Sequence, residues 1–310
     1  MKSLIKIGTR GSKLALYQAE VVRTKLKTLF RLLECEFVKI HTKGDMIRGA
    51  AIRSIGPGIF TREIEEALLA NEIDIAVHSA KDLATELPEG LEICATLARE
   101  DARDCLVARE GKKLDQLNQG AKIGTSSLRR RAQLKKLRPD LEILEMRGNV
   151  DTRLKKIEQG EYDGIVLAHA GLKRLGLANF VTEVFEEEHF LPQAGQGALA
   201  IEIRKGDLEI QELIQPLNHE LTFHRVAAER SFLRRLEGGC QIPAGISSKI
   251  EGDILTLKGA IFSLEGDREV IDTFTGPISE GEKTGVALAE KLLQAGGDEI
   301  LKAIRNAQEK

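Results

Sequence analysis

Cysteines are few in this sequence, and its apolar runs are short. The four cysteines are scattered along 310 residues and form no Cys-x-x-Cys pair, so a disulfide framework is not expected. The N-terminal residues, MKSLIKI, contain no apolar stretch long enough for a signal peptide, and no run elsewhere approaches the length that spans a membrane. We therefore expect a cytoplasmic protein that does not contact a membrane.

The sequence also lacks an excess of positive charge and the usual metal-binding patterns. Lysine and arginine total 46 against 48 acidic residues, so the net charge of −2 provides no overall basic field for nucleic acid. The six histidines form no His-Glu-x-x-His motif and no cluster with cysteine at ligand spacing, and there is no P-loop. We expect no metal centre, and any anion site must come from local clustering of cations.

The pattern up to about residue 200 alternates short strand-like runs with helical periodicity. Helices are predicted at 13–29, 128–137 and 150–158, each after a strand-like run and a polar turn. Repeated strand–turn–helix units favour an α/β fold with mixed, mostly parallel sheets. The stretches 98–103 and 192–197 are the best candidates for crossings between two lobes of this kind.

The residues from 220 onward follow another pattern. A long amphipathic helix is followed by three strands in succession and then by two helices. Consecutive strands with helices outside them indicate a smaller α+β domain with an antiparallel sheet. These elements are predicted at 220–236, 245–250, 254–262, 269–275, 282–295 and 298–307.

Cationic and polar residues recur in the turns that follow the predicted strands. In open α/β sheets, ligands bind beyond the carboxyl ends of the strands, where helix N-termini offer free N–H groups to anions. Arginine adds a planar fork suited to carboxylate or phosphate, so this recurrence predicts a ligand with several negative groups. The turn residues are Arg10, Ser12, His78, Ser79, Lys81, Asp82, Thr125, Ser126, Ser127, Arg129, Arg130, Arg147, Arg153, Lys173 and Arg174.

Each of these residues also has a plainer interpretation. Any one arginine could belong to a solvated helix face or a surface ion pair, and for the basic residues between 131 and 138 this is the better interpretation. Asp82 lies among cations and should stay ionised, so it could stabilise positive charge on a substrate. Its alternatives are an N-cap or a salt-bridge partner.

Cys240 is the most unusual of the four cysteines. It lies in LEGGCQIP, where a helix is predicted to end at the glycine pair and proline prevents it from restarting. A thiol on such a loop could be a hydrolase nucleophile, but that role needs a positioned base, and no local signature supports it. Cys35, Cys94 and Cys105 lie in or beside apolar runs and are predicted to be small core residues.

Seven motifs, taken in order, resemble the porphobilinogen deaminase family, also called hydroxymethylbilane synthase. The likeness runs from residue 5 to about residue 245, with a looser match beyond. The motifs are Gly8–Ser12 with Leu14–Leu16 and Gln18–Ala19, Asp74–Asp82, Gly124–Arg131, Arg147–Val150 with Thr152–Arg153, Ala170–Leu175, Gly195–Ala198 and Leu236–Gln241.

This resemblance implies a reaction and a cofactor. Enzymes of the family carry a covalent dipyrromethane on a cysteine thioether, and the matching residue is Cys240. They add four porphobilinogen molecules head to tail onto that cofactor, release ammonia at each step, and free 1-hydroxymethylbilane by hydrolysis. Each pyrrole ring carries an acetate and a propionate, so the growing chain is a polyanion. Asp82 matches the family carboxylate that stabilises positive charge on pyrrole nitrogen and could aid proton transfer.

The resemblance also divides the predicted site residues into two groups. The first group, which is expected to bind incoming substrate or the elongating chain, comprises Arg10, Ser12, Gln18, Arg147, Arg153, Arg174 and Gln196. The second group, which is expected to bind the cofactor, comprises Lys81, Asp82, Thr125, Ser127, Arg129 and Arg130, and Cys240 is expected to form the thioether bond to it.

The family fold has three domains, two of which resemble the lobes of periplasmic solute-binding proteins. The predicted division is 1–97 with 198–216, then 98–197, then 217–310. Some relatives carry lysine where this chain has Pro57, which offers an anion neither a side-chain donor nor an N–H. We therefore leave that loop out of the site and expect the segment 49–60 only as a mobile cover.

Two other functions fit parts of the sequence. An anion-binding module of two lobes without catalysis would look similar, but it predicts no covalent adduct at Cys240. A nucleic-acid binder could use the basic helix from Ser127 to Arg138, but the net charge of −2, the 4% aromatic content and the lack of a known module oppose it. The family resemblance further implies a monomer, with possible hand-over of its product to the next enzyme of the pathway.

Overall fold

The computed structural model describes residues 2–46, 58–236 and 242–308. Cys240 and Pro57 therefore lie outside the described residues, as does most of the segment 49–60. The chain forms two compact units. Unit 1 comprises Met1–Glu100 with Gly197–Val226, and unit 2 comprises Asp101–Gln196 with Ala227–Lys310. The first two junctions fall inside the stretches predicted as crossings, and the division into three domains stays a prediction.

Unit 1 is built on a five-stranded sheet with the strand order β2-β1-β3-β10-β4. Strand β1 pairs in parallel with β2 and β3, and β10 pairs antiparallel with β3 and β4, so β10 alone runs against the others. The strands are β1 Leu4–Arg10, β2 Glu34–Ile40, β3 Ile75–Ser79, β4 Leu91–Thr96 and β10 Leu199–Arg204.

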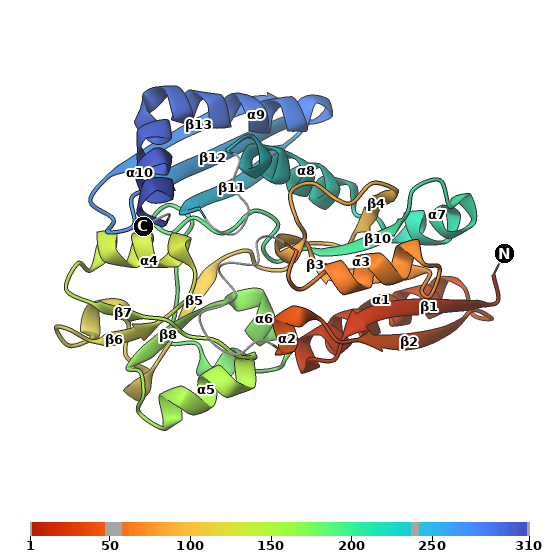
Figure 1. Cartoon of the computed structure of the whole chain (residues 1–310), viewed down its shortest axis with the longest axis horizontal. Coiled ribbons are helices and arrows are strands. Elements are labelled where there is room, and N and C mark those ends of the chain that lie inside the picture. The colour runs from red at the N-terminus through yellow and green to blue at the C-terminus, as the bar shows by residue number, and fades with distance from the viewer. Residues whose placement is uncertain (1, 47–57, 237–241, 309–310) are drawn as a thin grey trace. The chain divides into compact units, whose positions relative to one another are not determined.

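Helices cover both faces of this sheet (Figure 1). Helix α1 (Lys13–Leu29) buries Val22 and Leu26 against one face, in a core that it shares with α7 (Leu208–Ile214). Helix α3 (Arg62–Leu69) packs Ile64 and Leu68 on the opposite face, and the short α2 spans Lys43–Met46. The first half of α8 (Glu220–Arg235) also belongs to unit 1.

Unit 2 repeats the same sheet plan in the order β7-β6-β8-β5-β9. Strand β6 pairs in parallel with β7 and β8, whereas β5 pairs antiparallel with β8 and β9. Helix α4 packs on one face, and α5 and α6 pack on the other. The bounds are β5 Asp104–Ala108, β6 Lys122–Gly124, α4 Leu128–Leu137, β7 Glu142–Leu144, α5 Val150–Glu158, β8 Gly164–Ala168, α6 His169–Arg174 and β9 Glu183–Val184.

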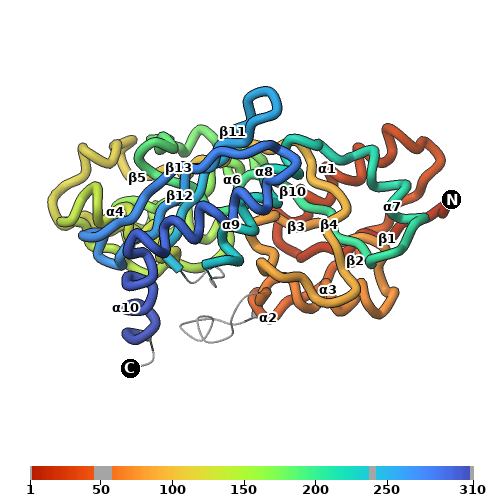
Figure 2. The backbone as a smooth tube through the Cα atoms, turned by 90° about the horizontal axis from the view of Figure 1, so that it is seen from above, coloured from red at the N-terminus to blue at the C-terminus, as the bar shows by residue number. Residues whose placement is uncertain are grey.

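The C-terminal part of unit 2 contains the predicted antiparallel sheet, β11-β12-β13. Figure 2 shows α9 lying along this sheet, and Phe232 of α8 and Leu288 of α9 meet over it in one apolar core. On the other face, Ala260 and Phe262 pack against Ala132 of α4. The elements are β11 Ala244–Glu251, β12 Ile254–Phe262, β13 Glu269–Pro277, α9 Gly281–Leu292 and α10 Asp298–Gln308.

The predicted fold class is therefore confirmed: two α/β sheets of mixed, mostly parallel strands and a smaller antiparallel α+β part. The expected helix bounds match the structure for α1, α4 and α5. No described helix is both long enough and apolar enough to cross a membrane.

Candidate functional site

In unit 2 the parallel strands β7, β6 and β8 end at one edge of the sheet, and the predicted polar turns follow them there. Ser127 caps α4, since its Oγ accepts from the backbone N–H of Arg130 at 3.4 Å. The N–H of Ser127 donates to Oγ1 of Thr125 at 3.2 Å. Ser126 donates from Oγ to the carbonyl oxygen of Met146 at 2.7 Å, which joins the turns after β6 and β7. The residues predicted after these two strands are thus held close together.

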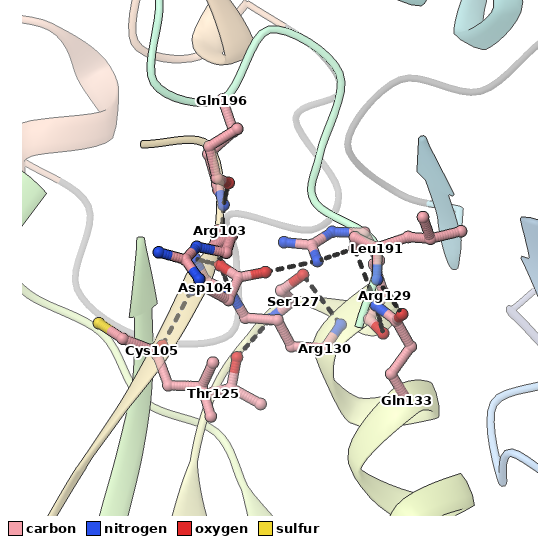
Figure 3. A network of polar contacts seen from close by, with 12 residues as sticks. Arg103, Asp104, Cys105, Thr125, Ser127, Arg129, Arg130, Gln133, Leu191 and Gln196 are labelled. Carbon is pink, nitrogen blue, oxygen red and sulfur yellow. Dashed lines mark hydrogen bonds and ion pairs between the residues drawn. The ribbon is translucent and has the colours of Figure 1, made fainter. Parts of the chain in front are cut away.

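A buried carboxylate that the sequence did not single out organises this edge. Asp104, the first residue of β5, is 0% exposed and accepts from Nη1 of Arg129 at 2.6 Å and from Nη2 of Arg130 at 2.7 Å (Figure 3). Gln196 is equally buried, and its Nε2 donates to Asp104 at 3.0 Å and to the carbonyl of Ala102 at 2.7 Å. The amide of Gln196 is therefore engaged with β5 and the segment before it.

Opposing effects act on the pKa of Asp104. Burial by itself would raise it, but the charges of Arg129 and Arg130 outweigh burial and hold the pKa well below its usual range. Asp104 therefore stays ionised at neutral pH. A carboxylate whose pKa is lowered in the folded state stabilises the fold above its unfolded pKa of about 3.9, and that stabilisation is lost as the pH falls.

Arg129 has donors that nothing in the described structure uses. Its Nη1 donates to Asp104 and to the carbonyl of Leu191 at 2.6 Å, whereas Nε and Nη2 are buried and find no partner among the described residues. Burial lowers the pKa of Arg129, and the charge of Arg130 acts in the same direction while Asp104 opposes it. Buried donors without acceptors cost free energy, so a site of this kind favours an anionic ligand.

Arg147 and Arg153 extend the positive cluster along the turn after β7. Burial lowers the pKa of Arg153 to about 10, and the charges of Arg130 and Arg147 add to the effect. Nε of Arg153 donates to the carbonyl of Gly148 at 2.7 Å. Nε of Arg147 is buried without a partner among the described residues. Asp104 pairs with two of these four arginines, and Glu145 lies 3.9 Å from Nη2 of Arg147. The cluster suits a ligand with several negative groups.

Ser127 and Arg129 also line a small cavity together with the C-terminal part of unit 2. Its walls include Phe232, Leu233 and Ile242. Leu233 lies before the undescribed stretch 237–241 and Ile242 directly follows it, so the chain on both sides of that stretch reaches the cavity that Arg129 lines.

In unit 1 the predicted residues follow β1. Ser12 caps α1, and its Oγ accepts from the N–H of Ala15 at 3.2 Å. The guanidinium carbon of Arg10 lies 4.3 Å from the centroid of the Phe60 ring, a cation–π arrangement. Both residues therefore lie at the carboxyl end of β1, as predicted.

The turn after β3 carries Lys81 and Asp82. Strand β3 ends at Ser79, whose Oγ accepts from Nε2 of the buried Gln18 at 2.9 Å, and one 3₁₀ turn follows at Ala80–Asp82. Asp82 is half-buried, and its side chain makes no hydrogen bond or ion pair with the residues that the structure describes. Neither of its plainer interpretations, an N-cap or a salt bridge, is found within that part of the chain.

The basic residues further along α4 have structural partners. The interpretation as surface ion pairs is confirmed for Arg131, Lys136 and Arg138, whereas Lys135 binds backbone carbonyls. Arg131 pairs with Glu265, Lys136 with Glu269, Arg138 with Asp140, and Lys135 donates to the carbonyls of Pro139 and Leu141.

The three described cysteines are free, and burial raises the pKa of each thiol. The pKa of Cys94 rises to about 11 and that of Cys105 to about 12, while Cys35, half-buried, shifts in the same direction. These thiols are poor nucleophiles at neutral pH, and the prediction of core residues holds for Cys94 and Cys105. The described residues contain no group of His, Cys, Asp or Glu that could hold a metal ion.

Removal of the Asp104 carboxylate would leave two buried guanidinium groups without a counter-charge. We expect Asp104→Ala to lower the free energy of unfolding by about 3–5 kcal/mol, measured by urea denaturation. The matched control is Glu265→Ala, which removes the exposed partner of Arg131 and should cost about 1 kcal/mol or less. Equal losses in the two variants would contradict the structural role of Asp104.

The sequence of this chain is similar to known proteins over almost its whole length. The sequence matches two family models: "Porphobilinogen deaminase, dipyromethane cofactor binding domain" over residues 5–212 and "Porphobilinogen deaminase, C-terminal domain" over residues 223–294. The porphobilinogen deaminase of Geobacter sulfurreducens is 50% identical over 298 residues, which are 96% of this chain and 93% of that protein. That of Pelotomaculum thermopropionicum is 48% identical over 309 residues, 99% of each chain.

Solved structures of amino-acid-binding proteins show a more distant likeness. An ancestral arginine-binding protein bound to glutamine matches with a TM-score of 0.37 and 16% identity, over 70% of this chain and 91% of its own. An ancestral cationic amino acid solute-binding protein matches with a TM-score of 0.42 and 18% identity, over 69% and 88% of the two chains.

Proposed function

Because this chain belongs to the porphobilinogen deaminase family, we propose that the arginine cluster of unit 2 and the Asp82 turn of unit 1 carry out the family's reaction. The protein is a transferase of tetrapyrrole biosynthesis with a dipyrromethane cofactor. It adds four porphobilinogen molecules to that cofactor, releases ammonia, and frees 1-hydroxymethylbilane by hydrolysis. The assignment of individual residues to these steps is our proposal.

The observation that best supports the cofactor assignment is the pair of unused buried donors on Arg129. When bound, dipyrromethane supplies the pyrrole carbon to which the first porphobilinogen is added. Its acetate and propionate groups need donors in a water-poor site, and Nε and Nη2 of Arg129 are buried without partners in the described structure. Ile242, two residues after Cys240, lines the same cavity as Arg129, which supports Cys240 as the thioether residue.

Other residues of the proposed cofactor set contribute hydrogen bonds or charge. The hydroxyls of Thr125 and Ser127 lie in the turn that caps α4, at the positive end of the helix dipole. Asp104 holds Arg129 and Arg130 in place, but Nε and Nη2 of Arg129 have no hydrogen-bond partner among the described residues. Lys81 is assigned to the cofactor by its match to the family motif.

The elongating chain adds carboxylates at each step, and the remaining cations are proposed to bind them. Arg147 and Arg153 belong to the same cluster in unit 2, where burial, and then the charges of Arg130 and Arg147, lower the pKa of Arg153. Arg10 and Ser12 follow β1 in unit 1, and Arg174 ends α6. The side chains of Gln18 and Gln196 already donate to Ser79 and Asp104, so we propose that these two residues act by positioning their partners.

Asp82 is proposed to act on the charge that develops during each addition. Loss of ammonia from porphobilinogen leaves an electron-poor carbon, and bond formation places positive charge on pyrrole nitrogen. An ionised carboxylate near that nitrogen stabilises the charge and can accept a proton. Asp82 suits this role, because it is half-buried and has no partner among the described residues.

Four finer statements are proposals that the family resemblance supports. The substrate is the small molecule porphobilinogen, the protein acts in the cytoplasm as a monomer, and its product could pass directly to the next enzyme. Neither a nucleic acid nor a membrane is part of the proposed function.

Loss of the Arg129 side chain should prevent stable assembly of the cofactor. We expect Arg129→Ala, purified from cells that make porphobilinogen, to show the mass of the bare polypeptide, whereas the unaltered protein carries the added mass of dipyrromethane. Intact-protein mass spectrometry measures this directly. Arg131→Ala is the matched control, because Arg131 is two residues further along α4 and pairs with Glu265. A fully loaded and active Arg129→Ala protein would contradict the cofactor assignment.

A further inference from the structure

Unit 1 contains a buried ionisable pair that the proposed chemistry does not use. His78 of β3 and Glu202 of β10 are 5% and 0% exposed, and Nε2 of His78 lies 3.0 Å from Oε2 of Glu202. A third buried group, Glu65 of α3, faces them from the helix above the sheet. The sequence indicated His78 as a turn residue, but it lies within β3.

This pair is placed where β3 leads into the Asp82 turn. In the β3–β10 ladder Ala200 is opposite His78, so Glu202 reaches His78 diagonally across two rungs. The next residue, Ser79, is the last of the strand and accepts from Gln18, and the N–H of Ala80 then donates to the carbonyl of Ala198 at 3.0 Å.

Successive side chains of a strand point to opposite faces of the sheet. His78 is therefore held by Glu202 on one face, and Ser79 is held by Gln18 of α1 on the other. Hydrogen bonds therefore hold the end of β3 on both faces of the sheet, directly before the 3₁₀ turn Ala80–Asp82. A rotation or slide of β3 at this point would move the Asp82 carboxylate.

An apolar pair would fill this part of the core at a lower desolvation cost. Oε1 of Glu65 and Oε1 of Glu202 are both buried without a partner among the described residues. Burial raises the pKa of Glu65, and the nearby carboxylate of Glu202 adds to the rise, while Thr61, His78 and Arg62 oppose it. A buried polar pair of this kind is weak evidence for stability, and its better use is to select one geometry.

We propose that His78 and Glu202 are positioning residues for the reaction, and that their pair holds the end of β3 so that the Asp82 carboxylate stays in its working place. The inference rests on the role of Asp82 in the proposed function. Both side chains are buried, so they act through the backbone of residues 79–82. A displacement of a catalytic group by about 1 Å can cost as much as about 100-fold in rate.

The other end of β3 offers a matched control. Asp74 directly precedes the strand, accepts from Nζ of Lys2 at 2.6 Å and from the N–H of Lys6 at 2.8 Å, and is 9% exposed. Asp74→Asn disturbs a buried carboxylate on the same strand, but at the end away from Asp82. It therefore separates a general loss of stability from a displaced Asp82 turn.

The test compares Glu202→Leu, Glu202→Gln and Asp74→Asn in the full-length, cofactor-loaded protein. We expect Glu202→Leu to lower kcat by about 10- to 100-fold with KM for porphobilinogen changed by about twofold or less. Glu202→Gln keeps a hydrogen bond to the imidazole in either tautomer and should recover most of kcat. Asp74→Asn should lower Tm by about as much as Glu202→Leu does, but should retain kcat. Intact-protein mass should show the bound cofactor in all three variants.

Two results would overturn the proposal. One is a loaded Glu202→Leu protein whose kcat equals that of Asp74→Asn, and the other is a loss that appears in KM alone. If Glu202→Leu does not fold, His78→Leu provides the same comparison from the other side of the pair. Asp82→Asn is assayed in parallel: normal turnover in that variant means that the proposed function has failed, whereas inactive Asp82→Asn beside active Glu202→Leu means that only the positioning role has failed.

Discussion

Cys240→Ser is expected to abolish both the covalent adduct and turnover. The family cofactor is attached through a thioether, and a serine hydroxyl is a far weaker nucleophile than a cysteine thiolate. Intact mass of the unaltered protein should exceed the sequence mass by one dipyrromethane, and the variant should show no excess. The rate of 1-hydroxymethylbilane formation by the variant should fall to background.

Cys35→Ser is the control for this experiment, because Cys35 is the most accessible of the described cysteines. It should retain both the adduct and turnover. An adduct that persists in Cys240→Ser would place the attachment elsewhere. Protein that lacks any adduct, although porphobilinogen was available during expression, would favour an anion-binding module without catalysis.

Asp82→Asn should lower kcat by about 10²- to 10⁴-fold, the range typical for removal of a general acid–base or charge-stabilising group. The substitution removes the negative charge with little change in size, so the fold and the cofactor should persist. We expect intermediates with added pyrrole units to accumulate on the protein, because each addition is slowed. Rapid mixing with porphobilinogen followed by mass spectrometry would reveal them as a ladder.

Asp74→Asn serves as the control here as well, since Asp74 lies at the start of the strand that ends before Asp82. Its kcat should stay close to that of the unaltered protein. Near-normal turnover of Asp82→Asn would remove Asp82 from the mechanism and leave the arginine cluster as a binding site only.

On the proposed function, the charge balance of unit 2 would let one site hold a chain that grows more negative at every step. Asp104 offsets part of the charge of Arg129 and Arg130, while burial and the nearby charges of Arg130 and Arg147 lower the pKa of Arg153. The arginines are thereby kept in place before any ligand binds, and preorganised charge of this kind is the main source of electrostatic stabilisation in enzymes. In the proposed function, the carboxylates of the ligand complete the charge balance.

Local patterns in the sequence predicted those elements whose limits depend on neighbouring residues. Ser12 and Ser127 cap α1 and α4, and both helices begin at the predicted residues, because capping is settled within one turn of helix. The recurrence of cations after the predicted strands was also visible in the sequence. Parallel strands end at one edge of a sheet, so a turn residue after one strand lies near the turn after the next.

Other features were missed because they depend on distant contacts. Strands β4 and β5 and helix α7 were not predicted. Asp104 is an acidic residue directly before the apolar run Cys105–Ala108, which was the one available signal, and it was included in no group of site residues. Its partners come from α4 and from Gln196, which is 92 residues away along the chain.

Sequence alone was sufficient for the fold class and the family, because periodicity, capping and motif order are local or collinear properties, and the same motifs led to the proposed cations of the site. Tertiary structure alone decided which of those cations carry unused donors. Arg129 and Arg131 are two residues apart in the same helix, yet one is buried beside Asp104 and the other pairs with Glu265 at the surface. That difference arises from burial and from partners far along the chain, and the free energy of a buried donor depends on both.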